Sequence, residues 1–140
     1  MNREMSEVVG RRPPLMLPAD ATVQQAGEIM RDRRIGAILV TTPEGTLCGI
    51  FTGRDAVCRL LAEGRDPTKT TLGEVMTRDP ATISPSAHAI DALRLMQDGG
   101  FRHVPLVENG RLVGIASHGD FRGLEHARLD DETGFWEMMR

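Results

Sequence analysis

The chain repeats itself, and this internal duplication restricts its fold more than any other feature of the sequence. A shift of 66 residues, shortened to 65 after one turn, brings the first half of the chain into register with the second. The residues paired in this way include Val9 and Val75, Arg12 and Arg78, Ala26 and Ala92, Met30 and Met96, Gly45 and Gly110, Gly49 and Gly114, Ile50 and Ile115, and Asp55 and Asp120. Repetition at a fixed period indicates one structural unit used more than once. We expect two copies at about residues 5–63 and 71–128, a polar linker at 65–70, and a separate tail at 129–140.

Both copies carry the same expected order of elements, β-α-β-β-α. A short extended piece at 15–17 or 81–83 opens each copy, and an amphipathic helix follows. The apolar face of this helix consists of Val23, Ala26, Ile29 and Met30 in the first copy and of Ala89, Ala92, Leu93 and Met96 in the second. Two strands come next, at 37–40 and 47–51 or at 104–107 and 112–116. A second helix, which contains Val57, Leu60 and Leu61 in the first copy, ends the unit.

These elements predict an α+β fold in which two β-α-β-β-α repeats pack with pseudo-twofold symmetry. One unit of roughly 60 residues alone has a marginal core, because surface dominates at that size. Packing of the copies against each other would bury more apolar surface and create related clefts between them. The dipeptide Asn109-Gly110 favours a tight hairpin turn in the second copy, because a type I′ turn requires positive φ at both positions.

Composition narrows the functional classes. The net charge is −3, whereas a protein that wraps duplex nucleic acid usually carries a basic surplus. No apolar run approaches the ~18 residues of a membrane span, and residues 1–12 lack the apolar stretch of a secretory signal. We therefore expect a cytoplasmic protein that has neither duplex nucleic acid nor a membrane as a partner. Cys48 and Cys58 are expected to be small buried hydrophobes in a reducing compartment.

The same segment follows the second strand of each copy. It reads Gly-Ile-Phe-Thr-Gly-Arg-Asp at 49–55 and Gly-Ile-Ala-Ser-His-Gly-Asp at 114–120. The simplest interpretation is a helix start, with Thr52 or Ser117 as N-cap and the acid near the positive helix end. A functional interpretation is compatible with it, because helix-terminal N–H groups and a hydroxyl can hold phosphate, and an adjacent acid can hold a ribose diol.

A second candidate feature lies at the start of the central strand of the second copy. Arg102 offers a fork of donors for phosphate, and His103 can donate from either ring nitrogen. The matching residues of the first copy, Gly36 and Ala37, are small and would leave room for a flat ring beside the strand. The two clefts are therefore expected to be unequal.

On these residues the chain resembles a tandem cystathionine-β-synthase (CBS) domain pair, the Bateman module. The resemblance rests on Glu-Val-Met-Thr-Arg-Asp-Pro at 74–80, on Phe-Arg-His-Val-Pro-Leu-Val at 101–107, and on the two Gly-Ile-x-(Thr/Ser)-x-x-Asp segments. It covers about residues 5–128. The resemblance implies adenosine-type regulatory ligands in the clefts between the repeats, and dimers. We expect a homodimer with no catalytic residues and no other cofactor.

The resemblance places two candidate ligand sites on the chain. In the first, Arg102, His103, Ser117 and Asp120 would hold phosphate and ribose, with Leu15, Met16, Ile35, Gly36 and Ala37 along the adenine. In the second, Thr52, Arg54 and Asp55 would act with a base wall of Ala81, Thr82 and Phe101. The first site is the more complete, because Gly36 and Ala37 supply no phosphate donor to the second.

The expected function is that of a non-enzymatic sensor that binds AMP, ADP, ATP or S-adenosylmethionine and signals in trans to an effector protein. One alternative is a structural or protein-interaction module in which the two caps only stabilise helices. Another is a metal-responsive module using His103 and His118. An enzyme is not expected, because the sequence contains no nucleophile motif or phosphate-binding P-loop.

Overall fold

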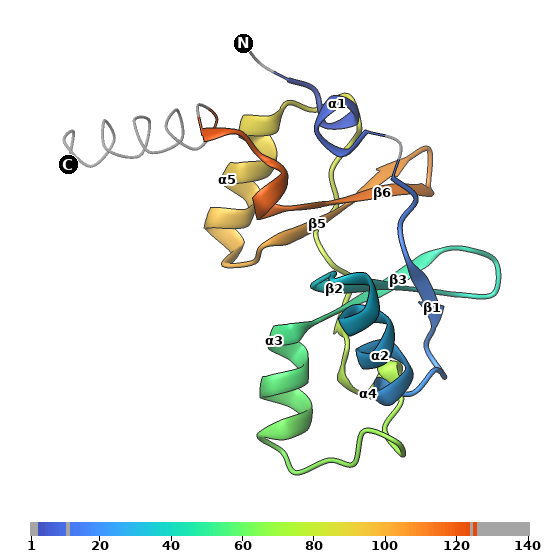
Figure 1. Cartoon of the computed structure of the whole chain (residues 1–140). Helices are drawn as coiled ribbons and strands as arrows, with labels where there is room; N and C mark the ends of the chain where they lie inside the picture. Colours follow the sequence, from blue (N-terminus) through green and yellow to red (C-terminus); the bar gives the residue numbers. More distant parts are fainter. Residues whose placement is uncertain (1–2, 11, 124, 126–140) are drawn as a thin grey trace. The chain divides into compact units, whose positions relative to one another are not determined.

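The computed structural model describes residues 3–10, 12–123 and 125 (Figure 1). The chain divides into two compact units. Within the described residues, unit 1 consists of 3–10, 12, 81–108, 113–123 and 125, and unit 2 consists of 13–80 and 109–112.

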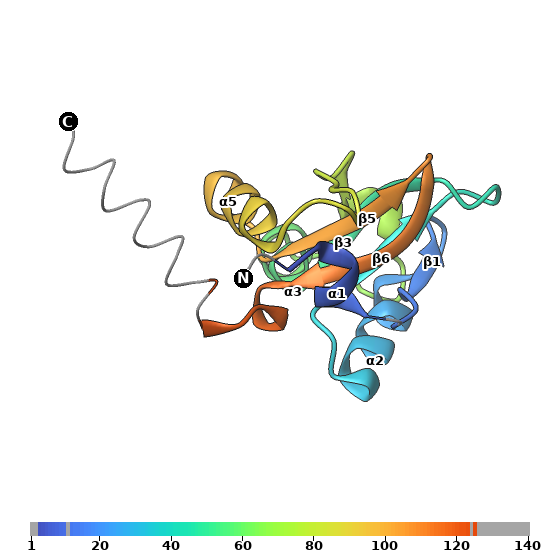
Figure 2. The ribbon, with the colours of Figure 1, turned by 90° about the horizontal axis from the view of Figure 1, so that it is seen from above.

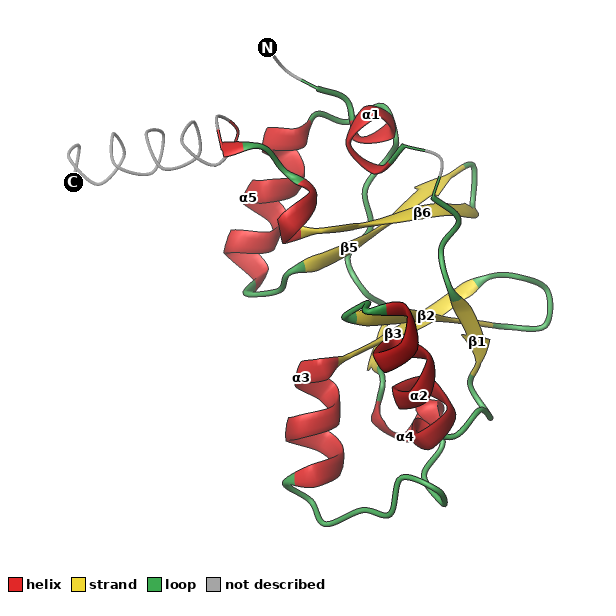
Figure 3. Cartoon of the chain, in the orientation of Figure 1, coloured by secondary structure: helices red, strands yellow, loops and turns green. Residues whose placement is uncertain are grey.

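Unit 2 is built on a four-stranded sheet. Its strand order is β1 (Met16–Pro18), β2 (Ala37–Thr41), β3 (Leu47–Thr52) and β4 (Thr77–Arg78). β1 runs parallel to β2, and the other neighbours are antiparallel. The helices are α2 (Val23–Arg33), α3 (Gly53–Asp55) continued by the π-helix η1 (Ala56–Leu61), and α4 (Leu72–Val75), shown in red in Figure 3.

Unit 1 contains one long helix and a two-stranded sheet, of which the turn and the first two residues of β6 (109–112) count with unit 2. β5 (His103–Glu108) and β6 (Arg111–Ser117) form a hairpin, with α1 (Met5–Val9), α5 (Ala89–Gly99) and the 3₁₀-helix η2 (His118–Asp120) beside it (Figure 2). The hairpin turn has φ of 51° at Asn109 and 77° at Gly110, which confirms the predicted positive values. Ile83 makes a parallel bridge to Leu106, so the expected extended piece is present next to β5.

Each unit is completed by the opening segment of the other repeat. In unit 1, Met5 N–H donates to Ala87 O at 2.7 Å, and Ala89 N–H donates to Arg3 O at 2.8 Å. In unit 2 the equivalent bonds run from Leu72 N–H to Ala21 O at 2.8 Å and from Val23 N–H to Thr70 O at 2.9 Å. The opening segment of each repeat is thus tied to the N-terminal end of the long helix of the other repeat. Neither repeat by itself supplies a whole compact unit.

Two repeated glycines make room for the exchanged segments. A Cβ at Gly114 in β6 would lie 3.1 Å from Val9 Cγ1, and a Cβ at Gly49 in β3 would overlap the Met76 side chain. Val9 belongs to α1, and Met76 directly follows α4. The absence of a side chain at these two aligned positions therefore lets each opening segment lie against a strand of the other repeat.

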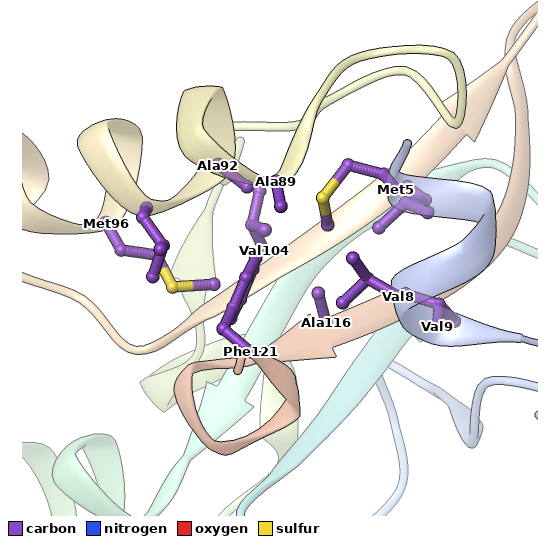
Figure 4. Close-up of a cluster of buried hydrophobic side chains, with 11 residues drawn as sticks. Met5, Val8, Val9, Ala89, Ala92, Met96, Val104, Ala116 and Phe121 are labelled. Carbon is purple, nitrogen blue, oxygen red and sulfur yellow. The ribbon is translucent and has the colours of Figure 1, made fainter. Parts of the chain in front are cut away.

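The exchanged segment supplies part of the hydrophobic core of unit 1 (Figure 4). Met5, Val8 and Val9 of α1 pack with the buried face of α5 and with the β5–β6 hairpin. The predicted apolar face of α5 is buried at all four positions, Ala89, Ala92, Leu93 and Met96. In unit 2, Leu72 and Val75 of α4 are likewise fully buried.

The predicted strands and long helices are confirmed, and so is the α+β class. The short elements α1, α4 and β4 were not expected from the sequence pattern. The expected polar linker 65–70 also makes contacts of its own: Thr70 is buried, its hydroxyl donates to Asp66 O at 2.8 Å, and its carbonyl oxygen accepts the Val23 N–H. In this part of the chain the segment caps α2 rather than merely joining the repeats.

The cysteines, the second helix of the second repeat and the C-terminal tail differ from the expectations or lie outside the described residues. Cys58 is exposed on η1, so it is not the buried hydrophobe expected; Cys48 is half-buried, and its Sγ donates to Val40 O at 3.3 Å. After β6 comes the 3₁₀-helix η2, which ends at Phe121, where the backbone is extended. Most of the segment expected to form the second helix, and the tail at 129–140 with Phe135 and Trp136, lie outside the described residues. None of the described helices is long and apolar enough to cross a membrane.

The exchange predicts that Met5, although near the chain start, is a core residue. Met5→Ala should lower the free energy of unfolding by about 2–5 kcal/mol, because it leaves a cavity in the core of unit 1. Met16→Ala is a matched control, because Met16 is 47% exposed and Met5 is 0% exposed. Urea unfolding of both variants tests this, and equal losses of stability would contradict the packing of α1 in unit 1.

Candidate functional site

The loop after β6 is fixed at both ends by buried side chains. Ala116 precedes Ser117 and is 0% exposed, and Phe121 follows Asp120 and is 7% exposed (Figure 4). Both pack in the core of unit 1, where Phe121 lies among the side chains of β5, β6 and α5. The four residues between these anchors, 117–120, are held near the surface in a defined conformation.

Asp120 is the central acid of this loop. Its Oδ2 accepts the Ser117 N–H at 2.8 Å, which is one half of a capping box. Its Oδ1 lies 3.0 Å from Arg12 Nη2, and the Asp120 side chain is 15% exposed. The carboxylate is therefore oriented by the backbone of its own loop and by an arginine from the chain's opening segment.

Arg102 and two histidines lie beside this loop. The His118 N–H donates to Arg102 O at 2.8 Å, and Arg102 Nη2 lies 3.4 Å from His118 Nδ1. His103 is half-buried at the start of β5. Burial lowers the pKa of His103, the positive charge of Arg102 lowers it further, and Asp120 acts in the opposite direction. Unit 1 thus brings Arg102, His103, Ser117 and Asp120 into one region.

A buried ion pair supports the loop from the chain start. Arg3 Nη2 donates to Glu125 Oε1 at 2.6 Å, Arg3 Nε donates to Glu125 Oε2 at 3.2 Å, and Arg3 Nη2 also reaches Asp120 O at 3.4 Å. Burial alone would raise the pKa of Glu125, but the hydrogen bonds from Arg3 and from the Arg122 N–H lower it overall. The pair is therefore charged at neutral pH and ties residue 3 to the end of the loop.

The equivalent loop of unit 2 uses its acid differently. Asp55 Oδ2 accepts the Thr52 N–H at 3.0 Å and the Thr52 hydroxyl at 3.1 Å. Its Oδ1 accepts the Thr77 hydroxyl at 3.0 Å and lies 3.7 Å from Arg59 Nε. The Asp55 side chain is only 8% exposed. In unit 2 the acid is enclosed by partners from β3, η1 and β4, as the helix-cap interpretation expects.

The other predicted site residues divide between the units. Ala37 pairs with Thr52 across β2 and β3, and the Gly53 N–H donates to Gly36 O at 3.3 Å, so these residues lie together in unit 2. The remaining unit-2 candidates are half-buried Ile35 and exposed Met16 and Arg54. In unit 1, Thr82 is exposed, and Phe101 packs against the core. The predicted groupings that join residues of both units stay predictions.

Arg12 is the residue that the sequence reasoning missed. Its alignment with Arg78 in the duplication marked it as a repeated position, but gave it no role. The role depends on the exchange of opening segments, which places residue 12 with unit 1 and next to Asp120.

The histidines do not form a metal site in the part of the chain that the structure describes. There, no three histidine, cysteine, aspartate or glutamate side chains gather closely enough to hold a metal ion. His118 Nδ1 also faces the guanidinium of Arg102, whose charge opposes a bound cation.

Comparison with known proteins gives the class of this chain. The pattern of the CBS domain matches residues 5–62 and 72–126. The chain belongs to the CBS domain family and contains two copies of the domain, a CBS pair, as the resemblance in its sequence indicated.

Relatives of this chain include small and large CBS-domain proteins. It is 37% identical to the CBS domain-containing protein YhcV of Bacillus subtilis over 99 residues, and this aligned region covers 71% of this chain and 69% of YhcV. It is 40% identical to the CBS domain-containing protein CBSCBSPB3 of Arabidopsis thaliana over 101 residues, and this aligned region covers 72% of this chain but 18% of CBSCBSPB3. The chain therefore spans less than a fifth of the length of that plant relative.

Solved structures of similar fold are also CBS proteins. The CBS domain protein PAE2072 from Pyrobaculum aerophilum, complexed with AMP, has a TM-score of 0.81 at 25% identity, covering 92% of this chain and 99% of that one. Hypoxic Response Protein I with two coordinated zinc ions has a TM-score of 0.71 at 28% identity, covering 84% and 95%. The CBS domain pair of MJ0100, in complex with 5′-methylthioadenosine and S-adenosylmethionine, shares the fold at a TM-score of 0.75 and 24% identity, covering 91% and 98%.

The environment of Asp55 predicts a structural role for Thr77. Thr77→Val removes a hydroxyl donor from a buried carboxylate and should lower the free energy of unfolding by about 1–3 kcal/mol. Thr82→Val, at an exposed threonine, should change it by about 0.5 kcal/mol or less. Chemical unfolding of the two variants decides the matter, and a neutral Thr77→Val would show that the Asp55 network contributes little.

The lowered pKa of His103 predicts a pH-dependent stability. Below about pH 6.5 the unfolded chain binds a proton at this residue, while the folded chain still holds it neutral. The free energy of unfolding should therefore fall as the pH drops from 7.5 towards 5.5, and His103→Gln should reduce that fall. Thermal unfolding across this range measures the effect. An unchanged pH dependence in the variant would contradict the burial of His103 beside Arg102.

Proposed function

We propose that the chain is a non-enzymatic regulatory module that binds one adenosyl ligand at the Asp120 loop of unit 1. The observation that carries the proposal is the arrangement of Asp120, an oriented and partly accessible carboxylate, beside the guanidinium group of Arg12, with the guanidinium of Arg102 next to His118 of the same loop. A carboxylate accepts hydrogen bonds from ribose hydroxyls, and guanidinium groups bind phosphate. The half-buried Ser117 hydroxyl is a further polar group for the same ligand.

The relatives support the choice of ligand class. A CBS domain protein of similar fold is complexed with AMP, and a CBS domain pair of similar fold is complexed with 5′-methylthioadenosine and S-adenosylmethionine. Membership of the CBS domain family together with an acid and cations in one loop region favours an adenosyl compound over other small molecules.

We propose that one ligand binds per chain rather than two. Asp55 has four polar partners within its own unit and its side chain is 8% exposed, so a ribose diol would have to displace Thr77 or Arg59. The Asp120 side chain contacts the Ser117 N–H and Arg12, and it is 15% exposed. The loop of unit 2 serves mainly to cap the helix that follows it.

The signal is proposed to act on another protein. A ligand shifts an equilibrium between two arrangements only by its differential affinity for them. The Asp120 loop is tied to the opening segment through Arg3 and Arg12, so a ligand at Asp120 would change the contacts of that segment. We propose that a homodimer carries this change to an effector.

Isothermal titration calorimetry with AMP, ATP and S-adenosylmethionine tests the proposal. The wild-type chain should bind at least one of them with a stoichiometry near one. Asp120→Asn should weaken binding by about tenfold to a hundredfold, because charge-assisted hydrogen bonds to the ribose are lost. Asp98→Asn, at an exposed aspartate of α5, is the matched control and should bind as the wild type does.

Other outcomes would overturn the proposal. If none of the three compounds binds, the chain is an interaction module rather than an adenosyl sensor. Binding of Zn²⁺ alone, lost in His118→Gln, would favour the metal-responsive alternative. A stoichiometry near two would contradict the structural role assigned to Asp55.

A further inference from the structure

Arg12 is held in place by two hydrogen-bonding groups. Its Nε donates to Val9 O at 3.1 Å, at the end of α1, and its Nη2 lies 3.0 Å from Asp120 Oδ1. The Arg12 side chain is 60% exposed, although both contacts fix its guanidinium. A guanidinium has five N–H donors, and these contacts use two of them. Arg12 therefore combines a defined position beside the candidate ribose acid with donors accessible to a ligand.

Arginine and histidine side chains lie in the same region as this acid. Arg102 is exposed and lies next to His118, whose Nδ1 can accept from it only while that nitrogen is unprotonated. Arg102 and Asp120 are the charged groups close enough to shift the pKa of His103, in opposite directions. Of these two, Asp120 is already paired with Arg12. Arg12 thus contacts the Asp120 carboxylate, and Arg102 lies beside the two histidines of the same region, while Arg3 nearby is neutralised by Glu125. Such a region attracts an anion and opposes a cation.

We propose that Arg12 is a ligand-selecting residue, which together with Arg102 binds the phosphate of an adenine nucleotide whose ribose is held by Asp120. The selected ligands are then phosphorylated adenosyl compounds, such as AMP, ADP or ATP. S-adenosylmethionine carries two positive charges, on its sulfonium and ammonium groups, against a single carboxylate, and adenosine carries no charge, so both gain less from these arginines than a phosphate does. This inference rests on the proposed function, because it requires an adenosyl ligand at Asp120.

The duplication provides a matched control for Arg12. Arg78 is the aligned residue in the opening segment of the second repeat. It is exposed, and its Nη2 donates to Gly73 O at 3.0 Å. Arg78→Gln therefore removes the same charge from the equivalent position without touching Asp120.

The test compares adenosine, AMP, ADP and S-adenosylmethionine by calorimetry on the wild type, Arg12→Gln and Arg78→Gln. The wild type should bind AMP and ADP at least about tenfold more tightly than adenosine or S-adenosylmethionine. Arg12→Gln should remove most of that difference, while the affinity for adenosine changes by less than about threefold. Arg78→Gln should behave as the wild type does. Added NaCl should weaken nucleotide binding more in the wild type than in Arg12→Gln, because salt screens exposed charges.

Distinct results overturn this inference and the proposed function. Equal losses of adenosine and AMP affinity in Arg12→Gln would show that Arg12 only positions Asp120. Unchanged AMP affinity, or a wild-type preference for S-adenosylmethionine, would exclude a selecting role for Arg12 while leaving adenosyl binding intact. If none of the four compounds binds to the wild type, the proposed function itself fails.

Discussion

The exchange of opening segments between the two repeats is the constraint on which the rest of the structure depends. Two backbone hydrogen bonds tie residues 3 and 5 to the start of α5, and two equivalent bonds tie residues 70 and 72 to the start of α2. The segments then contribute Met5 and Leu72 to the cores of the units they join. Because each core contains residues from both repeats, folding of one unit requires both halves of the chain.

The candidate site is a consequence of this exchange. The Asp120 loop is fixed from inside by Ala116 and Phe121, and it meets the opening segment through Arg3 and Arg12. In unit 2 the corresponding acid, Asp55, meets the exchanged segment through the hydroxyl of Thr77. The same loop pattern thus gives a buried structural acid in one unit and a partly accessible acid beside an arginine in the other. This difference is the physical basis for assigning ligand binding to unit 1.

Much of the fold could be predicted from the sequence because it follows from local periodicity. The apolar spacing of α5, the alternation of short strands and glycines, and the Asn109-Gly110 turn each depend on residues close in the chain. The exchange could not be predicted in this way, since periodicity shows which face of an element is buried but not which element covers it. The repeated Gly49 and Gly114 were a signal of close approach, although the residues that approach them became visible only in the structure.

Most of the residues of the candidate site, but not all of them, could be selected from the sequence. Arg102, His103, Ser117 and Asp120 were selected from the resemblance, and all four lie in one region of unit 1. Arg12 was not selected, because its contact with Asp120 joins residues more than a hundred positions apart. Unequal sites were already expected from Gly36 and Ala37, but the different surroundings of Asp55 and Asp120 depend on such distant contacts and had to be found from the structure.

The measurement that tests this account most directly is a nuclear magnetic resonance titration of ¹⁵N-labelled protein with AMP. We expect saturable shifts of the backbone amides at Ser117, His118, Gly119 and Asp120, and of the side-chain Nε–H of Arg12. The amides at 52–55 should move little. Shifts concentrated at 52–55, or no saturable shifts at millimolar AMP, would contradict the assignment of nucleotide binding to the Asp120 loop.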